Sequence, residues 1–219
     1  MTIHFQKELE QLKKRILSLG AMVEERVHMA TKAIETRDGD LALRIIDADH
    51  EIDEIEVEIE EDCLKVLALH QPVAVDLRYI TAVIKINNDL ERVGDEAVNI
   101  AERVASISNR APLQVPFDFS TMAEKTEAMV NNSLDALVNL DADIAYKVCL
   151  ADDEIDDMNR GIYDIVKGAI RSQPEEAGYL INLLLVARHL ERIADHATNI
   201  AEEVIYLIEG LIHRHNKPA

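Results

Sequence analysis

Residues 90–104 read LERVGDEAVNIAERV and residues 190–204 read LERIADHATNIAEEV, so ten of these fifteen positions are identical. A second pair of segments, residues 38–54 and 141–157, shares eight of seventeen positions. The two copies are offset by 100 residues in the first comparison and by 103 residues in the second. Similarity of this extent within one chain indicates a tandem duplication.

Apolar residues recur at the three- and four-residue spacing of an α-helix in both copies, as in Val83, Ile86, Leu90, Val93 and Ala97. The pattern predicts six helices, at about 3–37, 40–69, 73–108, 118–140, 143–171 and 175–213. Short connections between consecutive helices are typical of antiparallel neighbours. The predicted fold is therefore all-α, a tandem duplication of an antiparallel three-helix bundle.

The two units are expected to meet at residues 109–116, which contain two prolines and are the only stretch with the composition of a linker. Residues 1–108 then form the first three-helix unit and residues 117–219 the second. Pro72 and Pro174 suit the first turn of the third helix in each unit, where a missing backbone N–H costs no hydrogen bond.

The chain of 219 residues is strongly acidic, with 42 Asp and Glu against 23 Lys and Arg and a net charge of −19. Contact with a nucleic-acid backbone needs basic surface, so this balance argues against a nucleic-acid partner. The hydrophobic fraction of 48% is ample for a packed core. Seven glycines and five prolines are too few for a β-sandwich or barrel, which supports the helical prediction.

Signals for export or membrane insertion are missing from the sequence. The first fourteen residues contain no apolar signal-peptide region. The longest apolar stretch, residues 179–187, is nine residues long, whereas a spanning helix needs about 20. Cys63 and Cys149 stand far apart without a CxxC motif. We therefore expect a cytoplasmic protein that reaches the membrane only through partners.

Several acidic and amide residues are identical in the two copies, whereas neighbouring core positions carry different residues. Glu91, Asp95 and Asn99 fall within one stripe at 100° per residue, and the stripe faces away from the apolar face of its helix. The matching residues on the other copy's third helix are Glu191, Asp195 and Asn199. The second helices carry the pairs Asp49/Asp53 and Asp152/Asp156.

These stripes lack the lysine or arginine that usually lies four residues from a helical carboxylate. Like charges at that spacing destabilise a helix by about 0.2–0.5 kcal/mol per pair, yet the i±4 neighbours of Asp95 are Glu91 and Asn99. Carboxylate and amide oxygens without thiolate suit hard cations such as Mg²⁺, Mn²⁺, Ca²⁺ or iron ions. A metal site and a plain solvated acidic face both remain open at this point.

Other candidate groups are less informative. Glu25 and His28 form an ExxH motif as in di-iron bundles, which require two such motifs, and the chain has no second one. His50 and His189 border the acidic stripes as candidate nitrogen ligands or as surface residues. Arg92 and its repeat partner Arg192 would either neutralise carboxylates across the helix pair or cover the surface.

Taken together, these residues resemble the PhoU family of bacterial phosphate-uptake regulators. The family's tandem bundles carry E(D)xxxD motifs, which here are Asp49-xxx-Asp53, Glu91-xxx-Asp95, Asp152-xxx-Asp156 and Glu191-xxx-Asp195. The stretch QPVAVDLR at 71–78 is similar to the family's QPxAxDLR segment. The second copy reads SQPEEAGYLI and departs from that segment. The similarity extends from about residue 5 to 211.

The resemblance implies a regulator rather than an enzyme. It would repress the phosphate-starvation response when phosphate is plentiful, and would link the ATPase of the phosphate ABC transporter to a sensor histidine kinase. It implies a homodimer with multinuclear clusters of iron, zinc, manganese or magnesium. The implied ligands are the eight motif carboxylates, with Asn99 and Asn199 as additional ligands.

Two alternative functions are distinguishable from this one. A metal-free helical scaffold predicts that Asp95→Asn and Asp195→Asn leave every partner contact intact. A carboxylate-bridged di-iron enzyme predicts stoichiometric iron, oxygen-dependent turnover and buried ligands.

Overall fold

The computed structural model describes residues 3–111, 113 and 119–211. Their helices are α1 (Ile3–Thr36), α2 (Gly39–Asp47), α3 (His50–His70), α4 (Val75–Ser108), α5 (Phe119–Asn139), α6 (Ala142–Ser172), the short 3-10 helix η1 (Pro174–Glu176) and α7 (Ala177–Glu209). This arrangement confirms the predicted all-α fold with its internal duplication. Pro112 and residues 114–118 of the predicted linker region lie outside the described residues, as do residues 212–213 of the last predicted helix.

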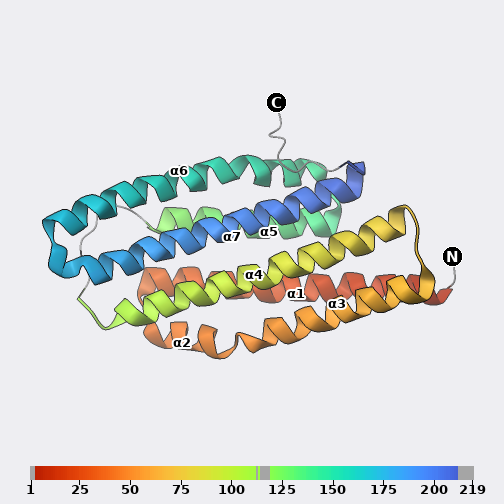
Figure 1. Ribbon diagram of the computed structural model, residues 1–219, viewed down its shortest axis with the longest axis horizontal. Coiled ribbons are helices and arrows are strands. Elements are labelled where there is room, and N and C mark those ends of the chain that lie inside the picture. Colours follow the sequence, from red (N-terminus) through yellow and green to blue (C-terminus); the bar gives the residue numbers. More distant parts are fainter. Residues whose placement is uncertain (1–2, 112, 114–118, 212–219) are drawn as a thin grey trace.

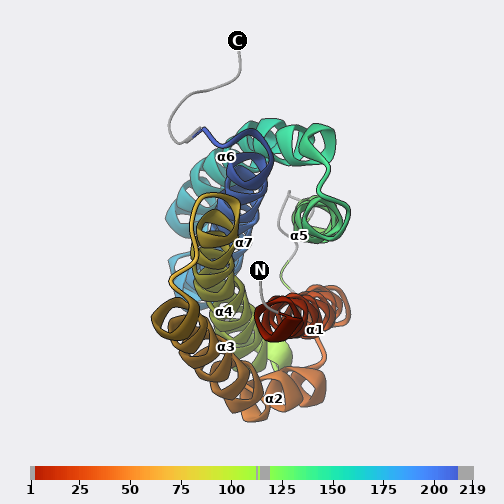
Figure 2. The same ribbon diagram turned by 90° about the vertical axis from the view of Figure 1, so that its right-hand side faces the viewer.

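The helices form two layers. In the first layer α6, α7, α4 and α3 lie side by side in that order, and α5 and α1 cover one face of it (Figures 1 and 2). The short α2 packs against α4 and α1. The third helices of the two halves, α4 and α7, therefore meet along the centre of the molecule, with their own halves on either side.

The same capping chemistry begins the second helical segment in each half. The carboxylate of Asp38 accepts a hydrogen bond from the backbone N–H of Leu41 at 2.9 Å, and Asp141 accepts one from Ile144 at 3.1 Å. An aspartate at this position satisfies one of the otherwise unpaired N–H groups of the first helical turn. This local signal is repeated because the sequence around it is repeated.

The second predicted helix of the first half is interrupted. The chain turns at Ala48 and Asp49, so that α2 and α3 together occupy the place of one predicted helix, whereas α6 runs without a break. The following helix begins at Val75 rather than near residue 73, because Gln71 and Ala74 adopt positive φ values of 45° and 50°. The interruption of the second helix places Asp49 in the connection between α2 and α3.

The core is built from the apolar stripes of the helices, in which residues such as Ile86, Leu90, Ile100 and Leu190 are completely buried. Burying such side chains is the main favourable contribution to folding. In the described part of the chain, no helix combines the length and apolar character that crossing a membrane requires. The acidic stripes lie outside this core.

Candidate metal centre

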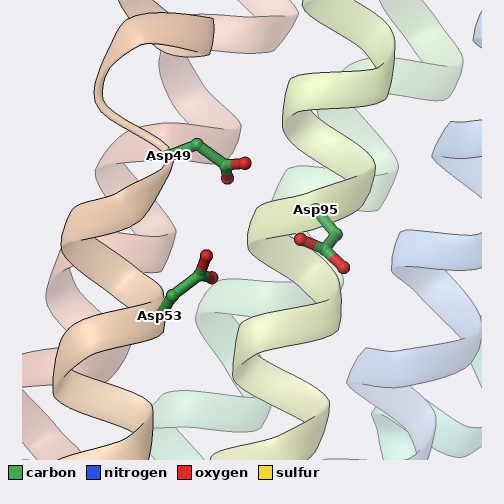
Figure 3. A group of neighbouring side chains, drawn as sticks. All are labelled: Asp49, Asp53 and Asp95. Carbon is green, nitrogen blue, oxygen red and sulfur yellow. The ribbon is translucent and has the colours of Figure 1, made fainter.

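Three carboxylates converge between α3 and α4 in the first half. Asp49 lies in the α2–α3 connection, Asp53 one turn into α3, and Asp95 on α4, and one oxygen atom of each lies within 4.8 Å of the others (Figure 3). Asp53 and Asp95 are exposed and Asp49 is half-buried. Within the described residues, this is the one group of three acidic, histidine or cysteine side chains close enough to hold a metal ion.

A close helix approach positions this group. Ile52 is buried between α3 and α4, and a Cβ placed on Gly94 would lie 3.0 Å from its Cδ1 atom. Gly94 therefore allows the two helices to approach more closely than an alanine would. Because Asp53 and Asp95 directly follow Ile52 and Gly94 in sequence, the same contact sets the separation of their carboxylates.

The electrostatics of the group are unfavourable without a cation. Burial, followed by the charges of Asp95 and Asp53, raises the pKa of Glu91 to about 7. Burial and then the neighbouring aspartates also raise the pKa of Asp95 and of Asp49. Nearby arginines oppose these shifts only in part. A bound cation would favour the charged carboxylates instead.

The second half holds its motif carboxylates near one another in a looser arrangement. Burial, followed by Glu191, Asp152 and Asp156, raises the pKa of Asp195 to about 6. The buried Oε2 atom of Glu191 has no hydrogen-bond partner. A pocket of about 420 Å³ is lined by Asp152, Asp195, Thr198 and other polar residues of α6 and α7. No three of these carboxylates approach one another within 4.8 Å, and Arg192 and His196 also line the pocket, so a metal site in this half stays a prediction.

The two asparagines of the predicted ligand set have other contacts. Asn99 lies close enough to hydrogen-bond the side chain of Glu96. Asn199 lines the second-half pocket and also donates to Asp89 of α4 at 3.2 Å. Neither belongs to the three-carboxylate group of the first half. Their predicted role as metal ligands stays a prediction.

Residues 16–104 and 119–204 each match the PhoU domain. The chain belongs to the PhoU family. It is 40% identical over 209 residues to the phosphate-specific transport system accessory protein PhoU homolog of Aquifex aeolicus, covering 95% of both chains. It is 36% identical over 207 residues to the Clostridium acetobutylicum homolog with the same description, covering 94% of both.

Solved PhoU structures have the same fold. The crystal structure of PhoU from Pseudomonas aeruginosa matches with a TM-score of 0.90 and 34% identity, covering 94% of this chain and 100% of that one. The phosphate transport system regulatory protein PhoU from Streptococcus pneumoniae matches with a TM-score of 0.84 and 30% identity, covering 95% and 98%.

Sequence reasoning missed the buried polar junction between the two PhoU domains. Glu96 of α4 is 3% exposed, and its carboxylate lies 2.6 Å from Nδ1 of His189 and 3.0 Å from Nη1 of Arg192. Burial by itself would raise the pKa of Glu96, but the hydrogen bond with His189 and the charge of Arg192 lower it. The structure thus assigns His189 and Arg192, left open by the sequence, to this junction.

The junction has a reciprocal partner that follows the internal duplication. Asp89 lies 2.9 Å from Nδ1 of His196, and positions 89 and 96 correspond to 189 and 196 in the repeat. The first half thus supplies both carboxylates, and the second half supplies both histidines. The sequence contains a signal for these pairs. At offset 100, His189 stands where the first copy has Asp89, and His196 stands where it has Glu96.

The remaining candidates are not members of the three-carboxylate group, although the charges of His50 and Arg92 act on the pKa of Asp49 and of Asp95 respectively. His28 of the ExxH motif lies 2.9 Å from the Glu127 carboxylate of α5, while Glu25 is exposed. His50 is exposed. Arg92 lines a groove of about 610 Å³ between the two halves.

Gly94→Ala tests the close approach of α3 and α4. The added Cβ would overpack Ile52, which costs about 1–3 kcal/mol, while alanine gains about 1 kcal/mol of helix propensity over glycine. We therefore expect a small loss of stability but a clear loss of metal affinity in the first half, measured by calorimetric titration. Ala194→Gly at the equivalent position is the control, and equal affinity loss in both variants would contradict the helix-spacing argument.

The raised pKa values predict how the stability of the metal-free protein depends on pH. The pKa of Glu91 rises from 4.5 to about 7, so the folded state holds a proton that the unfolded state has lost. The stability that protonated Glu91 contributes is fully present below pH 4.5 and is lost as the pH rises through about 7. Thermal unfolding from pH 4 to 8 should show this decline, and Glu91→Gln should flatten it. Glu35→Gln, an exposed change of equal charge on α1, should not.

Proposed function

We propose that this protein is a non-catalytic, metal-binding regulator of phosphate uptake. In this proposal it joins the ATPase of a phosphate ABC transporter to a sensor histidine kinase at the cytoplasmic side of the membrane, and represses the starvation response when phosphate is plentiful. The two PhoU domains and the names of the relatives, which describe accessory proteins of a phosphate-specific transport system, support this role.

The observation that carries the metal-binding part is the convergence of Asp49, Asp53 and Asp95. These three make no ion pair with a residue in the described part of the chain, and their oxygen atoms lie within 4.8 Å of one another. Hard cations hold oxygen ligands at about 2.0–2.6 Å, so one ion fits among oxygens at this separation. The donor set is all oxygen, as such ions prefer.

The chain's own residues suggest how a cation would act. Asp49 sits in the turn between α2 and α3, so its ligation with Asp95 would join that turn to α4. The ion would supply positive charge and coordination bonds to a surface that is otherwise strongly negative. Binding to the folded state alone stabilises that state and fixes the surface offered to partners.

The alternatives receive less support. A di-iron enzyme would need ligands inside the bundle. In contrast, His28 contacts Glu127, Glu25 is exposed, and the carboxylate group includes two exposed aspartates. A metal-free scaffold differs from our proposal in its response to metal removal. Homodimer formation stays a prediction.

The proposal is tested by measuring binding to the purified transporter ATPase and to the kinase's cytoplasmic region. We expect at least a tenfold weaker affinity for one or both partners after chelation, and recovery when the metal is restored. The Asp53→Asn/Asp95→Asn variant should bind weakly with or without metal. Undiminished binding after chelation would contradict the metal-dependent mechanism, and absence of binding in every condition would contradict the adaptor function.

A further inference from the structure

The outer groove between α6 and α7 has an apolar floor. Two adjoining hollows of about 500 and about 290 Å³ share Tyr163 and Leu184. Val166 and Ile170 of α6 extend the apolar lining toward the end of that helix. Tyr163 is 53% exposed, although its ring is large and mostly apolar. This groove plays no part in the candidate metal centres.

The edge of the groove carries positive charge in a chain of net charge −19. Lys167 and Arg171 line the second hollow, and Arg160 and Arg188 line the first. Arg160 also pairs with Asp156 and Asp157, and Arg188 with Glu191. Asp164 is the one acidic residue among the described lining residues. Lys167 lies over the Tyr163 ring, with its Nζ atom 5.9 Å from the ring centre. Positive edges around an apolar floor favour a ligand that is both apolar and anionic.

The equivalent groove of the first half has different chemistry. In the groove that α3 and α4 form with α7, Glu60 occupies the position of Tyr163 at offset 103, and Lys85 that of Leu185 at offset 100. Glu56 likewise stands where the second copy has Asn159. The groove that includes the first-half positions extends onto α7, whereas the second-half groove is lined by α6 and α7 alone, and of the two only the latter has an apolar floor with basic edges. The fold alone does not require these residues.

We propose that this groove binds an acidic amphipathic helix of a partner protein. The lining from Asn159 to Arg171 covers thirteen residues of α6, or about 18 Å at the rise of an α-helix, which matches three turns of a bound helix. Apolar residues of the partner at i, i+3, i+4 and i+7 meet Tyr163 and Leu184. Its acidic flanks meet Lys167 and Arg171, since Arg160 and Arg188 already pair with carboxylates of this chain. The rest of this acidic molecule repels such a helix, which directs it to the groove.

The inference rests on the proposed adaptor function, because it names the kind of segment through which a partner attaches. None of the motif carboxylates lines the groove, but Arg160 and Arg188 pair with the motif residues Asp156 and Glu191. The variants that test the groove are therefore made at Tyr163 and Arg171. The groove inference can therefore fail while the metal-dependent mechanism stands, and the reverse.

The test uses the full-length protein and three labelled 14-residue helical peptides that share one leucine pattern and carry Glu, Gln or Lys at the flanks. Fluorescence anisotropy should show the Glu peptide binding at least tenfold more tightly than the Gln peptide. Tyr163→Glu, which restores the first copy's residue, and Arg171→Glu should each weaken that binding at least tenfold. Lys147→Glu, an equal charge change at an exposed site on α6, should leave it unchanged. Far-UV circular dichroism checks that every variant is folded.

A photo-crosslinking residue at position 163 identifies the occupant in cells. We expect the adduct to map to an acidic segment of another protein with helical apolar spacing, and expect no such adduct from position 147. Crosslinking to a second copy of this chain, or to a basic segment, would overturn the proposal, as would equal binding of the Glu and Gln peptides. If the transporter ATPase and the kinase bind normally to Tyr163→Glu, the groove inference fails while the adaptor function stands.

Discussion

The Asp53→Asn/Asp95→Asn variant is expected to lose the metal of the first half while keeping its fold. Each change removes the charge of an exposed carboxylate but keeps its shape. Because the wild-type carboxylates repel one another, the metal-free variant should be slightly more stable than the metal-free wild type. Mass spectrometry of untagged protein purified without chelator measures the metal per chain.

The duplication supplies the matched control for this experiment. Asp156→Asn/Asp195→Asn makes the same chemical change at the equivalent positions of the second half. Each double variant should lose only its own half's metal, and the two losses should add to that of the quadruple variant. The wild type should gain thermal stability from added metal, by about 2.7 kcal/mol at a hundredfold excess over Kd. Unchanged metal content in both double variants would show that the acidic stripes are not ligand sites.

Glu96→Ala is expected to lower the free energy of unfolding by about 2–3 kcal/mol, since hydrogen bonds to charged groups contribute about 1.5–3 kcal/mol each. Glu96 is buried where α4 meets α7 and contacts both His189 and Arg192. Removing it leaves His189 without its carboxylate in a part-buried position and loosens the contact between the two PhoU domains. Urea unfolding with a constant m-value measures the change.

Asp89→Ala is the matched control, because Asp89 and His196 form the reciprocal pair at the equivalent positions. The side chain of Asp89 is 15% exposed against 4% for Glu96. Water can therefore replace more of the hydrogen bonding that the substitution at position 89 removes. We expect a loss of about 1 kcal/mol, typical of an ordinary hydrogen bond. If Glu96→Ala costs no more than Asp89→Ala, the buried carboxylate is not the main polar support of the domain junction.

Local sequence predicted some of the breaks between helices and missed another. Asp38 and Asp141 cap the expected helices because capping depends on a few neighbouring residues. The turn at Ala48 and Asp49 has no such local marker, since the repeated sequence forms continuous helix in α6. Helix propensity is a weak preference that tertiary packing overrides.

The sequence by itself determined the helical class, the duplication and the acidic residues shared by the two copies, because periodicity and repetition are properties of the chain alone. Only the tertiary structure decided which of those carboxylates meet. The three-carboxylate group forms because Ile52 packs closely against Gly94, and this contact joins segments that are distant in sequence. The pairing of Glu96 with His189 likewise depends on how α4 lies against α7, and no local pattern contains that geometry.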